Sequence, residues 1–225
     1  MVNYSVERVD RLTDEEIEAT VDAAVAAIKH SNSALVMMGT RDEDRRRYCR
    51  AVIRACLADG DLLFAREDGS RRVVGMAVWF PPGRKMKSSE NMKAEFDSFV
   101  AKLPPAPKMW WEDPKQIYSK ATGPFLAEHL APYGVVDSWY CTCLVVHPDF
   151  QRNGIGSSLI EAYIEKLYTD DRAKDYPQVA LCTDTDRNIE FYKRLGFELK
   201  SSTTIPTPLD GVFYPVHCMS RCMSP

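Results

Sequence analysis

The residues best suited to bind a charged ligand lie in a short turn, residues 151–156, which contains Gly154 and Gly156. An apolar, β-branched run precedes the turn, and a run with helical spacing of apolar residues follows it. A helix that starts at such a turn leaves backbone N–H groups unpaired, and these groups together with the helix dipole attract anions. Glycine lacks the Cβ atom that would keep a phosphate away from the backbone. The pattern therefore predicts a site for a phosphate or diphosphate group.

Two common kinds of phosphate-binding turn fit this sequence poorly. A P-loop closes with Gly-Lys-Ser or Gly-Lys-Thr, whereas Ser157 follows Gly156 here. The dinucleotide fingerprint Gly-x-Gly-x-x-Gly needs a third glycine at the position that Leu159 occupies. A dinucleotide-binding fold therefore stays only a minor alternative.

The elements around the turn predict a strand, a helix and a second strand. Residues 139–146 have the composition of a buried strand, residues 157–168 carry an apolar helical stripe, and residues 179–182 are again strand-like. A unit of this kind joins parallel strands, so we expect at least part of the sheet to be parallel. A short helix over 188–194 is expected to end near Gly196.

Two segments of this region resemble motifs of one enzyme family. Residues 144–157, Leu-Val-Val-His-Pro-Asp-Phe-Gln-Arg-Asn-Gly-Ile-Gly-Ser, resemble motif A of the GNAT superfamily of acetyltransferases, a strand followed by Gln/Arg-x-x-Gly-x-Gly/Ala. Residues 188–197, Asn-Ile-Glu-Phe-Tyr-Lys-Arg-Leu-Gly-Phe, resemble motif B at the expected distance, and residues 215–221 resemble the closing strand. The resemblance covers the C-terminal part of the chain well, and residues 1–80 only in the order of their elements.

The resemblance implies that acetyl-CoA is the cosubstrate. It also implies that backbone groups of Leu144 and Val146 bind the pantetheine arm, and that Asn188 contacts the coenzyme near that arm. Tyr192 is expected to be the general acid that protonates the leaving thiolate. The expected coenzyme-binding residues are Leu144, Val145, Val146, Gln151, Arg152, Asn153, Gly154, Ile155, Gly156, Ser157 and Asn188.

Three of these residues have a structural alternative. Tyr192 fills the core in the alternative interpretation, and Asn188 caps the N-terminus of its helix. Arg152 is then a surface side chain that contributes only its backbone N–H.

A general base, which would remove a proton from the acceptor ammonium, is harder to assign. Several family members carry a catalytic glutamate at the strand position that Tyr140 occupies here. A tyrosine with an ordinary pKa near ~10 is a poor base at neutral pH. Asp137 points to the other face unless a bulge intervenes, and His147 and His217 are further candidates. The base stays unassigned.

Composition and charge argue against several other classes of protein. The formal net charge is −3, and the arginines of residues 41–50 alternate with acidic residues, which is typical of a solvated helix face rather than a nucleic-acid-binding arm. No apolar run is long enough to span a bilayer. The seven cysteines are an odd number and lie in apolar runs, which favours reduced thiols. We expect a cytoplasmic protein, with a nuclear location also compatible.

The pair Cys141 and Cys143 is the closest approach to a metal-binding motif. Alternation along a strand places both side chains on one face, and the Cys-x-Cys spacing is not that of a zinc ribbon. We interpret the pair as core packing and expect no metal site.

The N-terminal part of the chain predicts two helices and a hairpin. Capping boxes at residues 13–16 and 40–43 each precede a run with helical spacing. Residues 62–65 and 73–79 predict the two strands of a β-hairpin, and Gly75 within the second suggests a bulge or a close backbone approach.

Residues 81–135 differ in composition from the rest. This segment is rich in proline and contains Trp110 and Trp111, with helices expected near 88–103 and 114–131. Such an insertion either covers a substrate pocket as a lid or forms a packed accessory layer. The sequence favours neither alternative.

Together these features predict one GNAT-type domain over residues 1–225 with an α/β fold. We expect a mixed, twisted sheet of about seven strands, helices on both faces, and parallel strands 139–146 and 179–183 that splay apart at their C-terminal ends. The expected function is acetyl transfer from acetyl-CoA to a primary amine of a small molecule, without a covalent enzyme intermediate. A protein lysine or N-terminal acetyltransferase and a non-catalytic acyl-CoA-binding module are the alternatives, and the oligomeric state is left open.

Overall fold

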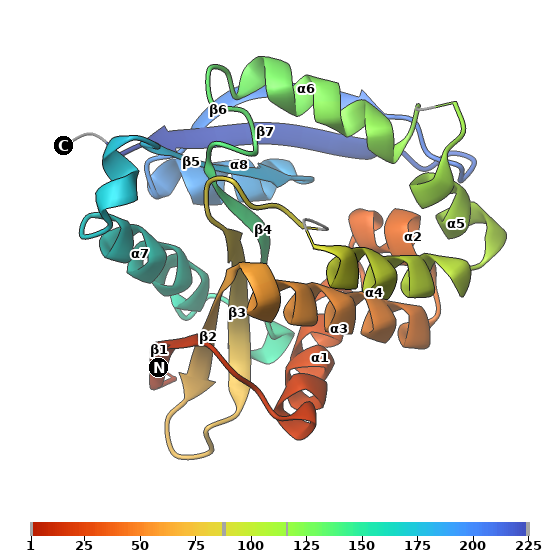
Figure 1. Ribbon diagram of the computed structural model, residues 1–225. Coiled ribbons are helices and arrows are strands. Elements are labelled where there is room, and N and C mark those ends of the chain that lie inside the picture. Colours follow the sequence, from red (N-terminus) through yellow and green to blue (C-terminus); the bar gives the residue numbers. More distant parts are fainter. Residues whose placement is uncertain (1, 87–88, 116, 224–225) are drawn as a thin grey trace.

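A computed structural model of the protein describes residues 2–86, 89–115 and 117–223 (Figure 1). Its centre is a seven-stranded sheet with the order β1-β2-β3-β4-β5-β7-β6. The strands are β1 (Tyr4–Val9), β2 (Asp61–Glu67), β3 (Val73–Phe80), β4 (Trp139–Val146), β5 (Gln178–Thr183), β6 (Glu198–Ile205) and β7 (Tyr214–Cys222). The sheet is mixed, because β4 and β5 pair in parallel while the other neighbours pair antiparallel. The predicted mixed α/β fold is confirmed.

Helices cover both faces of the sheet, also as predicted (Figure 1). The α-helices are α1 (Asp14–Ile28), α2 (Asn32–Met38), α3 (Asp42–Asp59), α4 (Glu90–Ala101), α5 (Pro105–Glu112), α6 (Thr122–His129), α7 (Ile155–Leu167) and α8 (Asp186–Arg194). Alternate residues of β2 pack on opposite faces, with Leu62 and Phe64 in the core cluster of α1, α3 and α4, and Leu63 and Ala65 in the cluster of α7 and α8.

β4 and β5 lie side by side over only three residue pairs, from Trp139 with Val179 to Cys141 with Leu181. Beyond Cys141, β4 continues to Val146 paired only with β3, so the two strands part at their C-terminal ends. The burial pattern changes at the same point, since residues 142–146 and 182–183 are partly exposed although both strands lie within the sheet. The predicted splay is confirmed.

A bulge at Thr142 overturns one expectation about β4. Val78 lies opposite Cys143 and Trp79 opposite Cys141, so Thr142 is an extra residue in β4. The extra residue shifts the alternation, and Cys141 faces the α7 cluster while Cys143 faces the α3 cluster. The prediction that both cysteines share one face is therefore wrong, because alternation holds only in an unbulged strand.

Gly75 lies next to a bulge and also at a close backbone approach, the two features that a glycine in a strand suggested. Ala65 lies opposite Gly75 and Arg66 opposite Val73, so a bulge lies next to it. A Cβ atom added at Gly75 would lie 3.0 Å from Ile155 Cγ2 and 3.2 Å from the Val145 carbonyl oxygen. The missing side chain allows the first turn of α7 to pack directly on β3.

Replacing Gly75 by alanine is expected to lower the free energy of unfolding by about 1–3 kcal/mol, because the added methyl group overpacks this contact. Chemical denaturation measures the change. Gly123→Ala is the matched control, since a Cβ atom there meets nothing within 4 Å. Equal stabilities of the two variants would contradict the close approach.

The first predicted capping box is present and the second is not. The Thr13 hydroxyl accepts from the Glu16 N–H, and the Glu16 carboxylate accepts from the Thr13 N–H. Helix α3 instead begins after Arg41, and no side chain caps it. Thr40 lies outside that helix because α2, which the sequence did not predict, ends at Gly39 with a φ of 78°. Buried Arg45 donates to the carbonyl oxygens of Gly39 and Thr40 and fixes this connection.

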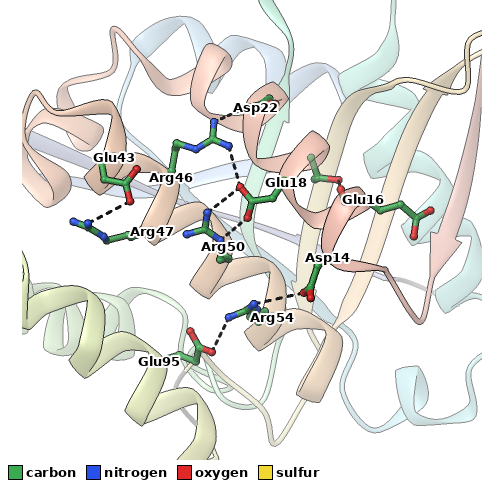
Figure 2. A network of polar contacts seen from close by, with 11 residues as sticks. Asp14, Glu16, Glu18, Asp22, Glu43, Arg46, Arg47, Arg50, Arg54 and Glu95 are labelled. Carbon is green, nitrogen blue, oxygen red and sulfur yellow. Dashed lines mark hydrogen bonds and ion pairs between the residues drawn. The ribbon is translucent and has the colours of Figure 1, made fainter.

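The arginines of residues 41–50 form ion pairs, as expected for a solvated helix face. Figure 2 shows the part of this network that joins α1, α3 and α4. Glu18 of α1 accepts hydrogen bonds from Arg46 and Arg50 of α3. Arg54 of α3 lies 3.1 Å from Glu95 of α4. The basic side chains are thus paired with carboxylates of the same molecule.

This pairing predicts how stability depends on pH. The hydrogen bond from Arg50 is the main cause that lowers the pKa of Glu18 from 4.5 to about 2, with a smaller contribution from Arg46. A lowered pKa in the folded state stabilises the protein above pH 4.5, and that stabilisation is lost as the pH falls from 4.5 towards 2. Glu18→Gln is expected to flatten the acid limb of a plot of melting temperature against pH. Exposed Glu15 of the same helix provides the control, Glu15→Gln, which should leave the limb unchanged.

The described part of residues 81–135 contains three α-helices rather than the two expected. The expected helix near 88–103 is α4, whereas that near 114–131 is shorter and corresponds to α6. Helix α5 was not predicted, because Pro105, Pro107 and two tryptophans interrupt the helical spacing of apolar residues. Proline is nevertheless well tolerated in a first helical turn. Phe96, Trp110 and Leu130 are buried, so the described part of the segment packs on the rest of the protein.

Candidate functional site

The predicted turn lies directly before α7 and has the backbone conformation that glycine allows. Gly154 is the N-cap residue with a φ of 82°, and Arg152 also has a positive φ of 64°. The first helical hydrogen bond runs from the Ser158 N–H to the Gly154 carbonyl oxygen. The N–H groups of residues 155–157 therefore have no acceptor within the helix, and no side chain caps α7 at Gly154. These donors are the groups that the sequence predicted to bind an anion.

Two side chains of the turn hold its backbone rather than project from it. The Gln151 amide donates to the Val146 carbonyl oxygen at 3.1 Å. The Asn153 amide donates to the carbonyl oxygens of Phe150 and Gln151, each at 3.2 Å. Both side chains fix the turn against the end of β4. Arg152 is exposed, in line with its structural alternative.

Tyr4 supports the same turn from the other end of the chain, and the sequence analysis missed it. Its hydroxyl forms a hydrogen bond of 2.9 Å with the Ser158 hydroxyl. A Cβ atom on Gly154 would lie 3.4 Å from this hydroxyl. Only the tertiary fold brings β1 to α7, so no local pattern around Tyr4 signals this contact.

The end of β4 presents backbone groups to the gap between β4 and β5. The His147 N–H donates to the Val74 carbonyl oxygen on β3. Since backbone groups of alternate residues point to the same neighbouring strand, those of Leu144 and Val146 point away from β3 and into the gap. The side chains of Leu144 and Val146 pack on the α7 cluster, and that of Val145 packs on the opposite face. This geometry suits hydrogen bonds to an extended amide-containing ligand.

Helix α8 begins beside the end of β5 and is tied to it. Thr185, not Asn188, is the N-cap residue, and its hydroxyl accepts from the Asn188 N–H. The Asn188 amide donates to the Thr183 hydroxyl at 2.9 Å. The N-cap alternative for Asn188 is thus wrong, and its side chain lies at the C-terminal end of β5.

Tyr192 lies on the buried side of α8 and is 7% exposed. Its ring contacts those of Phe191 and Phe197 edge to face, with centroid distances of 4.9 and 5.7 Å. Gly196, with a φ of 80°, ends the helix after the C-cap residue and allows the Phe197 N–H to bond the Tyr192 carbonyl oxygen. Burial raises the pKa of Tyr192 well above 10, with nearby thiols and Asp184 as smaller causes. The phenol therefore keeps its proton at neutral pH and can donate it.

A second group of polar side chains lies on the sheet face opposite α7 and α8. Burial raises the pKa of Tyr48 and of Tyr214, and it raises that of Cys143 to about 12. Interactions of Cys143 and Tyr214 with Tyr48 place these groups from β4, β7 and α3 within electrostatic reach of one another.

None of the candidate bases gains support from its surroundings. Burial raises the pKa of Tyr140 well above 10, so the phenol keeps its proton at neutral pH and is a poor general base. Asp137 is exposed before the first residue of β4, at the end of the strand far from the gap. Nδ1 of His147 accepts from the Asp149 N–H and Nε2 lies 3.0 Å from Arg72, while His217 bonds Ser202. Both histidines therefore have structural partners.

The described part of the chain contains no cluster of side chains that could bind a metal ion. No group of three or more His, Cys, Asp or Glu residues there is arranged to hold an ion. Within the same residues, no helix is long and apolar enough to cross a membrane.

Comparisons with known proteins point in one direction. Residues 121–199 match the model of a family described as an acetyltransferase (GNAT) domain. No curated protein sequence matches the chain. Among solved structures, a putative arylalkylamine N-acetyltransferase 7 from the mosquito Aedes aegypti gives a TM-score of 0.64 at 17% identity, covering 98% of this chain and 88% of that one.

Two further structures match over nearly their whole length. A histone acetyltransferase and related acetyltransferase from Corynebacterium glutamicum gives a TM-score of 0.62 at 20% identity, covering 100% of this chain and 99% of that one. A Drosophila melanogaster polyamine N-acetyltransferase gives 0.61 at 14% identity, covering 98% and 100%.

A glycine turn that opens a helix beside two splayed parallel strands defines the class of GNAT-like α/β proteins. Within that class, residues 121–199 match the GNAT acetyltransferase family. The family implies acetyl-CoA as the cosubstrate, and the unpaired N–H groups of residues 155–157 fit its diphosphate.

Proposed function

We propose that the protein transfers an acetyl group from acetyl-CoA to a primary amine of a small molecule. The observation that carries this proposal is the partly exposed gap between β4 and β5, with the glycine turn at one end and the Tyr192 phenol beside it. In this proposal the whole chain acts as one GNAT-type domain, and the described part of the segment 81–135 packs beside the site on the face opposite α7.

The residues around the gap have distinct roles in the proposed reaction. Acetyl-CoA supplies an acyl thioester whose carbonyl carbon the neutral amine attacks. The Val146 N–H, which points into the gap, stabilises the negative charge that develops on the carbonyl oxygen. Tyr192 donates its proton to the sulfur as the carbon–sulfur bond breaks. The amine forms the new bond directly, so no cysteine forms a covalent intermediate.

Two observations support a small-molecule acceptor. Helices α4 and α5 pack their aromatic side chains against Tyr48 of α3, on the side of the sheet that also carries Tyr214 of β7, which leaves less room for a peptide. Two structurally similar proteins are described as arylalkylamine and polyamine acetyltransferases. Another is described as a histone acetyltransferase, so a protein acceptor is the second candidate. A non-catalytic acyl-CoA-binding module is the third, and the protonated Tyr192 argues against it.

The test uses the purified protein. Calorimetry should detect acetyl-CoA binding in the micromolar range, and a thiol reagent should detect release of coenzyme A when small primary amines are added. A parallel series of lysine-containing and N-terminal peptides distinguishes the second candidate. Absence of coenzyme binding would overturn the proposal, and binding without turnover of any amine or peptide would favour the third candidate.

All seven cysteines are free thiols, and exposed Cys222 is among them. Thiols of this kind persist in a reducing compartment, which supports the proposed cytoplasmic location.

A further inference from the structure

Tyr4 lies in the edge strand β1, and its ring packs towards α7. The side chains of Tyr4 and Val6, two residues apart on β1, both pack on the α7 cluster, as alternation along a strand requires. The antiparallel register with β2 places Tyr4 opposite Glu67 and fixes its position in the sheet. The phenol is therefore attached to the sheet and reaches α7 from outside that helix.

The Tyr4 hydroxyl lies beside both ends of the first turn of α7. It forms a hydrogen bond of 2.9 Å with the Ser158 hydroxyl, and the Ser158 N–H closes that turn on the Gly154 carbonyl oxygen. At the other end, a Cβ atom placed on Gly154 would lie 3.4 Å from the same phenol oxygen, which is an ordinary van der Waals contact. Between these two positions lie residues 155–157, whose N–H groups have no acceptor within the helix.

The start of α7 cannot be stabilised by an ordinary N-cap without blocking its donors. An N-cap side chain would accept from the N–H of Gly156 or Ser157, which are groups that a diphosphate needs. Among the described residues no side chain does so, and the N-cap residue Gly154 has none to offer. Arg152 of the same turn has a positive φ of 64°, a conformation that persists only where surrounding contacts hold it. The turn therefore depends on support from outside the helix.

The contacts that support the turn fall on two sides of Gly154. The side chains of Gln151 and Asn153 bond to backbone carbonyl oxygens of residues 146, 150 and 151, all of which precede the helix. The hydrogen bond of Tyr4 ends on Ser158, beyond the unpaired donors. Tyr4 thus fixes the part of the turn that the two amides do not reach.

We propose that Tyr4 is a positioning residue for the coenzyme: its hydroxyl, bonded to Ser158, keeps the N–H groups of residues 155–157 oriented towards the diphosphate. This inference rests on the proposed function and adds to its coenzyme site a residue from the opposite end of the chain. Tyr4 acts through a hydrogen bond and not on the reacting atoms. Its loss should therefore weaken binding of the phosphate-bearing part of acetyl-CoA and leave binding of the acetyl-pantetheine part unchanged.

The test removes the hydroxyl and keeps the ring. Tyr4→Phe should raise Kd for acetyl-CoA, measured by calorimetry, by about 3- to 10-fold, the effect of losing one neutral hydrogen bond. The second ligand is S-acetylpantetheine, which has the thioester and the pantetheine arm but no phosphate, and NMR titration measures its Kd. That Kd should stay within about twofold of the wild type. A general loss of structure would weaken binding of both ligands, so the difference between them isolates the diphosphate.

Ser158→Ala removes the other partner of the same hydrogen bond. It should raise Kd for acetyl-CoA by a similar factor, and the double variant should bind no more weakly than either single variant, because all three lack the same bond. Tyr168→Phe is the matched control. The Tyr168 hydroxyl lies 3.4 Å from Arg221 at the C-terminal end of the same helix, so its removal should leave Kd for acetyl-CoA unchanged.

The outcomes distinguish this inference from the proposed function. If Tyr4→Phe binds acetyl-CoA as tightly as the wild type, or if both ligands weaken equally, the role of Tyr4 is wrong while the proposed function stands. Losses that multiply in the double variant would show that Tyr4 does not act through Ser158 and would also overturn the inference.

If the wild type binds no acetyl-CoA, the proposed function fails. Inorganic pyrophosphate is then titrated into the wild type and into Tyr4→Phe while the amide NMR shifts of residues 155–157 are followed. Weaker pyrophosphate binding by Tyr4→Phe supports the inference, and equal or absent binding overturns it.

Discussion

Gly154→Val is expected to lower the affinity for acetyl-CoA by at least about 100-fold. Gly154 has a φ of 82°, a backbone region that costs other residues about 1–2 kcal/mol and β-branched residues more. Relief of this strain moves the turn and with it the N–H groups of residues 155–157. A branched side chain also occupies the space through which a diphosphate reaches the backbone. Loss of two charge-assisted hydrogen bonds accounts for the expected change. Isothermal calorimetry measures it.

Gly69 provides a matched control for backbone strain. It has a φ of 86° in the turn between β2 and β3, and a Cβ atom there meets nothing within 4 Å. Gly69→Val should therefore lower the melting temperature by a similar amount while leaving acetyl-CoA affinity unchanged. Equal losses of affinity in both variants would mean that the effect is general destabilisation and not the turn itself.

Tyr192→Phe is expected to lower kcat by about 10²- to 10⁴-fold, the range for loss of a general acid. The affinity for acetyl-CoA should stay within about twofold of the wild type, because the ring still fills the same space. Within the described residues no hydrogen bond involves the Tyr192 hydroxyl, so its removal should change the melting temperature little. Steady-state kinetics and calorimetry together measure the two effects. A collapse of affinity with normal turnover at saturation would show that Tyr192 only fills the core.

Tyr163→Phe serves as the control for removing a buried phenol. The Tyr163 hydroxyl donates to Asp61 at 2.8 Å in the core under α7, so its loss should lower stability and leave kcat unchanged. The pH profile adds a second check on Tyr192. Because burial raises its pKa well above 10, the phenol keeps its proton through the physiological range. The rate should therefore show no alkaline fall from Tyr192 below pH 10.

The sequence predicted those parts of the fold that short segments determine by themselves. The strand at residues 139–146 has the predicted bounds, because its apolar run and the His-Pro that follows leave little choice. The glycine turn, helix α8 and the capping box at Thr13 also follow from local residue types. The resemblance to two family motifs lies in the same segments, so the expected coenzyme site and the observed splay coincide.

Other features depend on contacts between distant segments and were missed for that reason. The bulge at Thr142 is set by the register with β3, so the sequence of β4 alone could not place Cys143. Helix α2 is short, and its buried residues Ala34, Val36 and Met38 stabilise it through tertiary packing rather than propensity. Tyr4 meets the turn only in the folded chain.

The three residue pairs between β4 and β5 also bear on how the molecule moves. They are the register contacts that join the half of the sheet containing β1–β4 to the half containing β5, β7 and β6. An extended ligand arm lying along Leu144 and Val146 would lengthen this junction by adding backbone hydrogen bonds to it. Movement of one half of the sheet relative to the other should then decrease, and amides of residues 142–146 should exchange with solvent more slowly. Occupancy by the coenzyme would thus set the stiffness of the surface that receives the amine.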